Sequence, residues 1–198
     1  MAIKRFLPDV YQIAVDRERS CLVITPAGNI LVDTPEASEA MRAQIESLGG
    51  VKHLFITHRD DAGEACVYQA RLGAIVAIHR EDAGYVRGCS VDRLLEHGDT
   101  LTPVTEVVHL PGHSPGSSAL LIERGGGVLF TGDALPGQAD GSLRLPPEQY
   151  STNPIQAQSS LRRLLDYDFE AIFASRGEPI RSGGKEKLGH FLAQLQSS

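Results

Sequence analysis

The sequence lacks the features that mark several large classes of protein. No apolar run approaches the roughly 20 residues that a membrane-spanning helix needs, and the first residues lack the apolar stretch of a secretory signal. Lys and Arg are scattered through a chain of formal net charge -6, so no clustered basic face is predicted. We therefore expect no membrane and no nucleic-acid partner, and a small-molecule substrate or ligand instead. The oligomeric state is left open.

Cysteine is scarce as well. The three cysteines, Cys21, Cys66 and Cys89, lie far apart in the sequence and form no Cys-x-x-Cys pair. An odd number without metal-ligand spacing predicts reduced thiols in a cytoplasmic protein. On this interpretation Cys66 packs into the core from a helix.

The remaining composition is that of an ordinary globular protein. Apolar residues make up 41% and charged residues 22% of 198 residues, which predicts a single domain over residues 1–198. Segments with strand and helix patterns alternate, so the predicted class is α/β with helices outside the sheets. Strands are expected at 10–15, 21–25, 30–32, 53–57, 74–78, 106–110, 118–123, 127–131 and 171–174.

Helix boundaries are predicted from capping residues. Thr34 and Pro35 suit the N-cap and first position of a helix that ends at Gly49-Gly50. Asn153-Pro154 is a second such start. Further helices are expected at 64–72 and 185–195, and residues 136–147 are expected to form a loop near Asp133.

Three predicted strands run into polar loops, which span residues 57–61, 110–116 and 130–134. In α/β folds, ligands gather at the carboxyl ends of strands, so these loops are expected to face one point. Two histidines and up to three carboxylates would then meet, which suits zinc, non-haem iron or manganese. Taken singly, each residue is more often structural: a hydrogen-bonded histidine, a helix-capping aspartate or a turn.

The combined pattern resembles a known family. Pro-Gly-His-Ser-Pro-Gly-Ser at 111–117 followed by Phe-Thr-Gly-Asp at 130–133, with Leu-Val-Asp-Thr at 31–34, is similar to the metallo-β-lactamase superfamily. The resemblance spans residues 20–180 and implies a four-layer αββα sandwich. It is less specific for chemistry, because the superfamily contains hydrolases of several ester and amide classes, oxygenases and nitric oxide reductases.

The sequence departs from the family pattern at four ligand positions. The family's first metal motif is His-x-His-x-Asp-His, and residues 58–63 read His-Arg-Asp-Asp-Ala-Gly. His58 is kept, whereas Asp60, Ala62 and Gly63 stand where the second histidine, the aspartate and the last histidine belong. Arg176 stands where the family has a late histidine.

These departures remove the second metal of the family pattern. Ala62 and Gly63 have no donor atoms, and a guanidinium has no lone pair to offer. The resemblance leaves His58, His113 and Asp133, with Asp60 as a fourth ligand, for one zinc, iron or manganese ion, or for none. The first three positions match the iron site of the family's persulfide dioxygenase branch.

Arg176 itself has a physical interpretation. Loss of a dication leaves carboxylates facing each other, which is unfavourable when they are partly buried. A guanidinium in the vacated second site neutralises them, so we expect Arg176 to pair with Asp133 or Asp61. The alternative is an exposed arginine beside Glu178.

Three functions remain open. The first is a one-metal, hydrolase-like protein in which Asp61 or an unbound Asp60 acts as general base. The second is a mononuclear iron oxygenase. The third is a non-catalytic, metal-free binding or scaffold module that keeps the fold.

Overall fold

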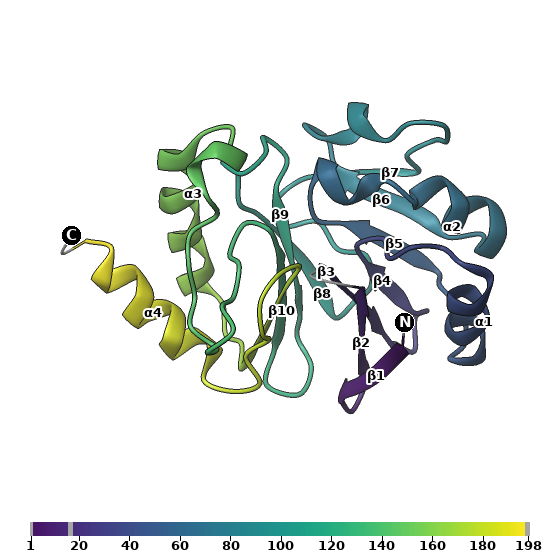
Figure 1. Cartoon of the computed structure of the whole chain (residues 1–198), viewed down its shortest axis with the longest axis horizontal. Coiled ribbons are helices and arrows are strands. Elements are labelled where there is room, and N and C mark those ends of the chain that lie inside the picture. Colours follow the sequence, from purple (N-terminus) through teal and green to yellow (C-terminus); the bar gives the residue numbers. More distant parts are fainter. Residues whose placement is uncertain (1, 16–17, 197–198) are drawn as a thin grey trace. The chain divides into compact units, whose positions relative to one another are not determined.

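The computed structural model describes residues 2–15 and 18–196 (Figure 1). The chain divides into two compact units, Met1–Leu95 and Glu96–Ser198. Each unit has its own sheet and its own α-helices. The prediction of one domain over 1–198 stays a prediction.

The first unit is built on a seven-stranded sheet whose strands follow each other in chain order. The first four strands pair antiparallel, and the last four pair parallel. Sequence patterns missed the first strand, which carries the charged pair Lys4-Arg5, and the last, which is only three residues long. The strands are β1 (Ala2–Leu7), β2 (Val10–Val15), β3 (Glu18–Val23), β4 (Ile30–Val32), β5 (His53–Ile56), β6 (Ile75–His79) and β7 (Arg93–Leu95).

Two helices cover one face of this sheet. They are α1 (Glu39–Ser47) and α2 (Ala65–Leu72), and they connect the parallel strands (Figure 1). Alternate strand residues point to that face because side chains alternate along a strand. The core that they form with the helices contains Ile13, Leu22, Leu31, Leu54, Ile56, Val76 and Ile78 from strands and Met41, Ile45, Ala65 and Tyr68 from helices.

The predicted start of the first helix was wrong by several residues. Helix α1 begins after Ser38, whose hydroxyl accepts a hydrogen bond from the backbone N–H of Met41 at 3.3 Å. Thr34 does not cap this helix. Its hydroxyl donates to the backbone carbonyl of Asp61 at 2.7 Å and accepts from the N–H of Glu64. A tertiary hydrogen bond therefore replaced the local cap.

The prediction of three reduced thiols was also wrong. Cys66, in the first turn of α2, and Cys89 form a disulfide with a Cα–Cα distance of 5.2 Å. Twenty-three positions separate the two residues, and the turn after β6 brings them together. Only Cys21 is a free, buried cysteine. The disulfide removes one argument for a cytoplasmic location, because disulfides are rare in that compartment.

The second unit is built on a four-stranded sheet in the order β11-β10-β9-β8. β8, β9 and β10 pair antiparallel, and β11 adds to the edge parallel to β10. This sheet has the bounds β8 (Thr105–His109), β9 (Ser118–Ile122), β10 (Val128–Gly132) and β11 (Ala171–Ala174).

The helices of the second unit pack on one face of its sheet. Leucines from the helical segments meet alternate strand residues there. The predicted Asn153-Pro154 start is confirmed, because the Asn153 side chain accepts a hydrogen bond from the N–H of Gln156 at 3.0 Å. The segments are η3 (Glu148–Tyr150), α3 (Pro154–Ser160), η4 (Leu161–Asp166) and α4 (Gly184–Gln194).

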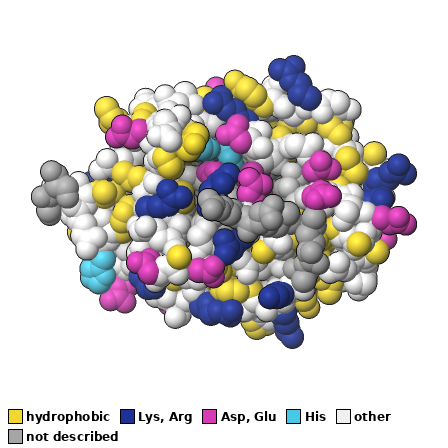
Figure 2. Space-filling model, in the orientation of Figure 1, with side chains coloured by type: hydrophobic (Ala, Val, Ile, Leu, Met, Phe, Trp, Pro, Cys, Tyr) yellow, Lys and Arg dark blue, Asp and Glu magenta, His cyan; other side chains and the backbone are white. Residues whose placement is uncertain are grey.

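The part of the chain that the structure describes contains two sheets and four α-helices, which confirms the predicted α/β class. Within residues 2–15 and 18–196, no helix combines the length and hydropathy needed to cross a bilayer. On the face shown in Figure 2, basic side chains lie among acidic ones without an extended basic patch. The absence of a nucleic-acid partner stays a prediction.

The Ser38 cap gives a first test. Replacement of an N-cap serine by alanine leaves a helix N–H without its acceptor and costs about 1 kcal/mol. We therefore expect Ser38→Ala to lower the free energy of unfolding by about 1 kcal/mol in urea denaturation. Ser47→Ala, at the other end of α1, is the matched control and should change it by less than about 0.5 kcal/mol. Equal effects of the two variants would contradict the assignment of the cap.

Candidate metal-binding segments

Parallel pairing brings the polar residues of the first unit to one edge of its sheet. β4 pairs with β5 in parallel, and Val32 lies opposite Phe55. Asp33 therefore follows β4 at the level where Thr57 and His58 follow β5. Asp33 is 4% exposed and has a left-handed backbone with φ of 59°, a conformation that aspartate tolerates better than most residues.

A chain of three hydrogen-bonded side chains fixes the tautomer of His58. The Asp33 carboxylate accepts from the Thr57 N–H at 2.7 Å and from the Thr57 hydroxyl at 3.0 Å. Because that hydroxyl proton goes to Asp33, Thr57 Oγ1 can only accept from His58 Nδ1, which lies 3.0 Å away. His58 then carries its proton on Nδ1. Its Nε2 keeps the lone pair that a metal ion requires.

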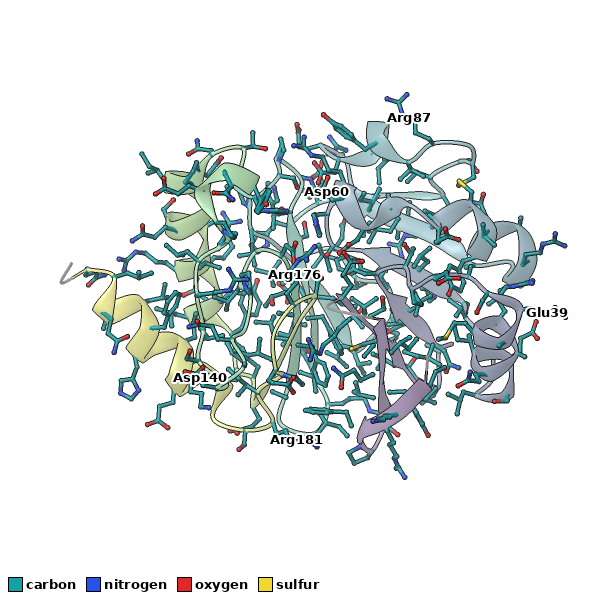
Figure 3. The ribbon with its side chains drawn as sticks, in the orientation of Figure 1. Glu39, Asp60, Arg87, Asp140, Arg176 and Arg181 are labelled. Carbon is teal, nitrogen blue, oxygen red and sulfur yellow. A yellow bond between two sulfur atoms is a disulfide. The ribbon has the colours of Figure 1, made fainter. Side chains whose placement is uncertain are left out.

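Asp60 and Asp61 lie on different sides of the His58 ring. The Asp60 carboxylate lies 3.9 Å from His58 Nε2, and its side chain is 64% exposed. The Asp61 carboxylate lies 3.4 Å from Nδ1 and is 20% exposed. Asp60 is thus on the side of the Nε2 lone pair, whereas Asp61 is on the side that orients the ring. Both residues belong to the 3-10 helix η1 (Arg59–Ala62), and Figure 3 labels Asp60.

Sequence reasoning missed a residue that holds this segment. Asp82 is fully buried and accepts a hydrogen bond from the backbone N–H of Arg59 at 3.0 Å. It follows β6, so it obeys the same rule that identified the other loops: a polar side chain after the carboxyl end of a parallel strand. This position after a predicted strand is visible in the sequence and identifies Asp82 as a candidate.

In the second unit, His113 sits in a tightly hydrogen-bonded loop. The Ser114 N–H donates to Ser117 Oγ at 2.9 Å, and the Gly112 N–H donates to the Ser114 carbonyl at 2.9 Å. The start of α3 closes the loop from outside, because the carbonyls of His113 and Gly112 accept from the N–H groups of Thr152 and Asn153. The His113 side chain is 5% exposed.

Asp133 and Arg176 meet at the carboxyl ends of β10 and β11. These strands are parallel, so the residues that follow them lie at the same edge. Arg176 Nε donates to Asp133 Oδ2 at 3.2 Å, and the two side chains are 43% and 14% exposed. The contact that we expected between Arg176 and an aspartate is therefore present with Asp133. Its role as a replacement for a metal ion stays a prediction.

A close backbone contact fixes the position of Arg176. The Gly137 N–H donates to the Arg176 carbonyl at 3.0 Å, and Gly177 has φ of 84°. A Cβ atom on Gly177 would lie 2.1 Å from the Gly137 carbonyl oxygen. Glycine is therefore required directly after Arg176. Figure 3 labels Arg176.

The family follows from comparison of the sequence. A sequence model described as the metallo-β-lactamase superfamily matches residues 6–195, almost the whole chain. This chain belongs to the metallo-β-lactamase superfamily. No functionally curated protein sequence matches it.

Solved structures of superfamily members have the same fold. A HARLDQ-motif mutant of the metallo-β-lactamase from Cronobacter sakazakii has 20% sequence identity and a TM-score of 0.74, covering 100% of this chain and 94% of its own. BJP-1, a subclass B3 metallo-β-lactamase of Bradyrhizobium japonicum, has 17% identity and a TM-score of 0.74, covering 98% and 90%. The metallo-β-lactamase family protein TTHA1429 from Thermus thermophilus has 22% identity and a TM-score of 0.69, covering 96% and 80%.

These likenesses establish the fold of this metallo-β-lactamase superfamily member. They do not establish its chemistry, which depends on its own residues.

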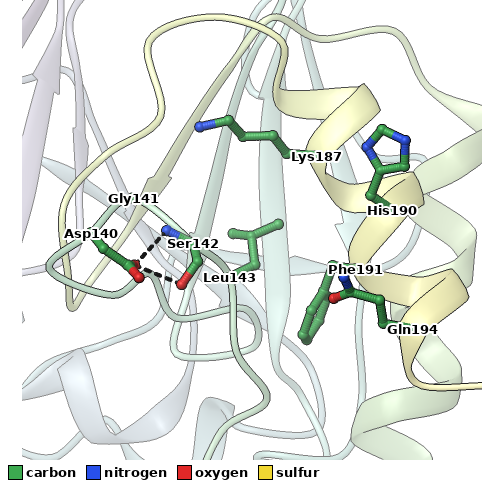
Figure 4. Close-up of a pocket in the computed structure, with 8 residues that line it drawn as sticks. All are labelled: Asp140, Gly141, Ser142, Leu143, Lys187, His190, Phe191 and Gln194. Atoms are coloured by element: carbon green, nitrogen blue, oxygen red, sulfur yellow. Dashed lines mark hydrogen bonds between the residues drawn. The ribbon is translucent and has the colours of Figure 1, made fainter. Parts of the chain in front are cut away.

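Within the second unit, the 136–147 loop was expected to lie near Asp133. The loop begins beside Arg176, to whose carbonyl the Gly137 N–H donates, and its tip lines a pocket of about 290 Å³ together with one face of α4 (Figure 4). The lining residues are Asp140, Gly141, Ser142, Leu143, Lys187, His190, Phe191 and Gln194.

This pocket differs chemically from the ligand segments. Ser142 donates to the Asp140 carboxylate from its hydroxyl at 2.7 Å and from its N–H at 2.9 Å, and these bonds lower the pKa of Asp140 (Figure 4). Leu143 and Phe191 are apolar, and Lys187 adds a positive charge. Acidic and basic groups are thus mixed around the pocket, which favours no single class of ligand.

The loop that carries His113 can be tested through Gly112. Its φ is 141°, and a Cβ atom there would lie 2.1 Å from the backbone nitrogen of Ala157. We expect Gly112→Ala to lower the free energy of unfolding by about 3 kcal/mol, since helix α3 must move. Gly141→Ala is the matched control, because φ is 77° but no atom lies within 4 Å of the added carbon.

Urea denaturation of both variants separates the effect of backbone strain from that of the steric clash between the added Cβ atom and α3. The control should lose only about 1 kcal/mol. Similar losses in the two variants would mean that α3 can move away from the added carbon without a further loss of stability.

Proposed function

We propose that this superfamily member is a hydrolase-like protein with at most one metal ion, acting on a small molecule. The proposed ligands are those predicted from the sequence: His58, Asp60, His113 and Asp133. The observation that carries the proposal is the fixed tautomer of His58. Its Nδ1–H donates a hydrogen bond to Thr57 Oγ1, so Nε2 carries the lone pair that a bond to a metal ion needs.

The donor set fits one divalent ion. Two imidazoles with one or two carboxylates are a usual set for zinc, iron or manganese. His58 meets the requirement for a defined ring orientation, and the backbone hydrogen bonds around His113 hold its loop in place. When bound, such an ion lowers the pKa of a coordinated water to about 7 and polarises a substrate oxygen.

The site for a second ion lacks donor atoms, and its electrostatic potential is unfavourable for a cation. Ala62 and Gly63 offer no donor atoms. The Arg176 guanidinium, 3.2 Å from the Asp133 carboxylate, places a fixed positive charge where a second cation would need a negative one. The family pattern is therefore reduced from two ions to one.

The two aspartates of η1 have separate roles in this proposal. Asp61 lies beside His58 Nδ1, where it orients the imidazole, and it stays a candidate general base. Asp60, exposed and beside Nε2, is either the fourth ligand or the general base that accepts a proton from water. Arg176 keeps its charge at all relevant pH values and is suited to hold an anionic group of the substrate.

Substitution within the first motif occurs elsewhere in the superfamily. The Cronobacter sakazakii protein is described by the motif HARLDQ, in which the first histidine is followed by no second histidine and the last position is glutamine. This chain likewise keeps its first histidine and lacks the other two. A changed motif thus accompanies a metallo-β-lactamase description in at least one relative.

One observation favours a metal-free alternative. The ion pair between Arg176 and Asp133 already neutralises a ligand carboxylate without a metal ion. On this alternative the chain is a non-catalytic binding or scaffold module. An iron oxygenase of the persulfide dioxygenase type is separated from both by the identity of the metal.

Metal content tests the proposal directly. Untagged protein purified without chelators should contain about one zinc, iron or manganese per chain by mass spectrometry. His58→Ala and His113→Ala, one in each unit, should each lose it while keeping the native circular dichroism spectrum. Zinc or manganese would favour hydrolysis and iron the oxygenase. Absence of metal from the native protein would establish the metal-free alternative.

The hydrogen-bond chain to His58 gives a second test. Thr57→Val keeps the side-chain shape but removes the hydroxyl that accepts a hydrogen bond from His58 Nδ1. Affinity for Zn²⁺, measured by competition with a chromogenic chelator, should fall about 10- to 100-fold. Thr25→Val, which removes a hydroxyl bonded within the 25–28 turn, is the control and should leave the affinity unchanged. An unchanged affinity in Thr57→Val would show that the tautomer is fixed by other groups.

The charge of Arg176 gives a third test. Arg176→Gln removes a positive charge beside Asp133, so the repulsion of a dication falls and Zn²⁺ affinity should rise about tenfold. Arg144→Gln removes the same charge from the 136–147 loop and is the control. A weaker affinity in Arg176→Gln would mean that Arg176 mainly orients the Asp133 carboxylate.

A further inference from the structure

The disulfide joins two segments that border the ligand loop of the first unit. Cys66 lies in the first turn of α2, four residues after η1, which contains Asp60. Cys89 lies in the segment after the 3-10 helix η2 (Ala83–Tyr85). Both cysteines are partly exposed. Figure 3 labels Arg87 in the same segment.

The same two segments meet at a second point through Arg59. Its Nη1 donates to the Tyr85 hydroxyl at 3.1 Å, and its guanidinium carbon lies 4.7 Å from the centre of the Tyr85 ring. Its backbone N–H donates to Asp82 at 3.0 Å. Residues 59–66 are therefore held to residues 82–89 at both ends, by polar contacts at one end and by a covalent bond at the other.

The part of this segment beyond Cys89 has separate anchors. Gln69 Nε2 donates to the Ser90 carbonyl at 2.9 Å and to the Asp92 carboxylate at 2.7 Å. Asp92 also accepts from the N–H of Val76. Loss of the disulfide therefore leaves residues 90–92 attached and releases the stretch between Tyr85 and Ser90, where Gly88 adds backbone freedom with φ of 91°.

We propose that Cys66–Cys89 is a reversible thiol–disulfide site whose reduction loosens the His58–Asp61 segment. The reductant is a dithiol: one of its thiolates attacks a cysteine sulfur, the cysteine S–S bond breaks, and a mixed disulfide forms. The second thiol then displaces the remaining cysteine thiolate. Two electrons and two protons pass to Cys66 and Cys89, and the reductant leaves as its own disulfide.

Metal affinity would then depend on the redox state of the protein, and this consequence rests on the proposed function. The effect of reduction on the order of residues 58–61 does not depend on the proposed function, because it follows from contacts that involve no metal. The third cysteine does not take part: burial raises the pKa of the Cys21 thiol well above its ordinary value, and the nearby Asp33 carboxylate adds to the effect. Thiolate is the reactive form, so Cys21 stays inert in the folded protein.

The test compares oxidised protein with protein reduced by dithiothreitol. Alkylation and intact-mass measurement under native conditions should add no label before reduction and two labels after it. Hydrogen exchange should then become at least fivefold faster in peptides covering residues 57–64 and 82–89, and stay unchanged in residues 96–196. The backbone N–H of Arg59, bonded to Asp82, is the most informative amide.

Variants separate the tether from side effects of the reductant. Cys66→Ser/Cys89→Ser should reproduce the reduced exchange pattern without dithiothreitol. Cys21→Ser should respond to dithiothreitol like the native protein. Tyr85→Phe keeps both sulfur atoms but removes the hydroxyl that Arg59 contacts, and should also speed exchange in residues 57–64.

The outcomes distinguish the two proposals. Full reduction with unchanged exchange in residues 57–64 would overturn the switch and leave the disulfide as a simple cross-link. A disulfide that reacts only after global unfolding would overturn it too. Faster exchange in a protein that binds no zinc, iron or manganese would support the switch and contradict the proposed function. About tenfold weaker Zn²⁺ binding in the reduced form would support both.

Discussion

The Asp33 carboxylate accepts hydrogen bonds from both the backbone and the hydroxyl of Thr57, and the loop that carries His58 depends on this interaction. A buried carboxylate and a left-handed aspartate are each unfavourable alone. They persist because the parallel pairing of β4 with β5 places the N–H and the hydroxyl of Thr57 within hydrogen-bond distance of the Asp33 carboxylate. The orientation and proton of His58 follow from that arrangement.

The second unit uses the same geometry with a different result. β10 and β11 are parallel, so the residues after them also share an edge, and there Arg176 donates to Asp133. One edge offers a lone pair for a cation, and the other brings its own cation to a carboxylate. An arginine is permanently charged, and it neutralises the aspartate at any metal concentration.

Membership in the metallo-β-lactamase superfamily therefore determines the scaffold but not the chemistry. Each ligand position of the family is a single side chain at a strand end, so it can be exchanged without disturbing the sheet that carries it. Ala62 and Gly63 show this plainly, because they stand in a well-formed 3-10 turn and its end. The number of metal ions that such a member can hold depends on its donor atoms, and Ala62 and Gly63 supply none.

The sequence by itself determined the α/β class, the family pattern, the loss of donors at three positions and the cap at Asn153, because each depends on local residue types or on near-neighbour spacing. Only the tertiary structure decided that Ser38 caps α1 in place of Thr34, that Asp82 holds Arg59, and that Cys66 is bonded to Cys89. Each of these depends on a partner 20 or more positions away, or on a competition that such a partner wins. Strand pairing sets those distances, and no local pattern in the sequence contains them.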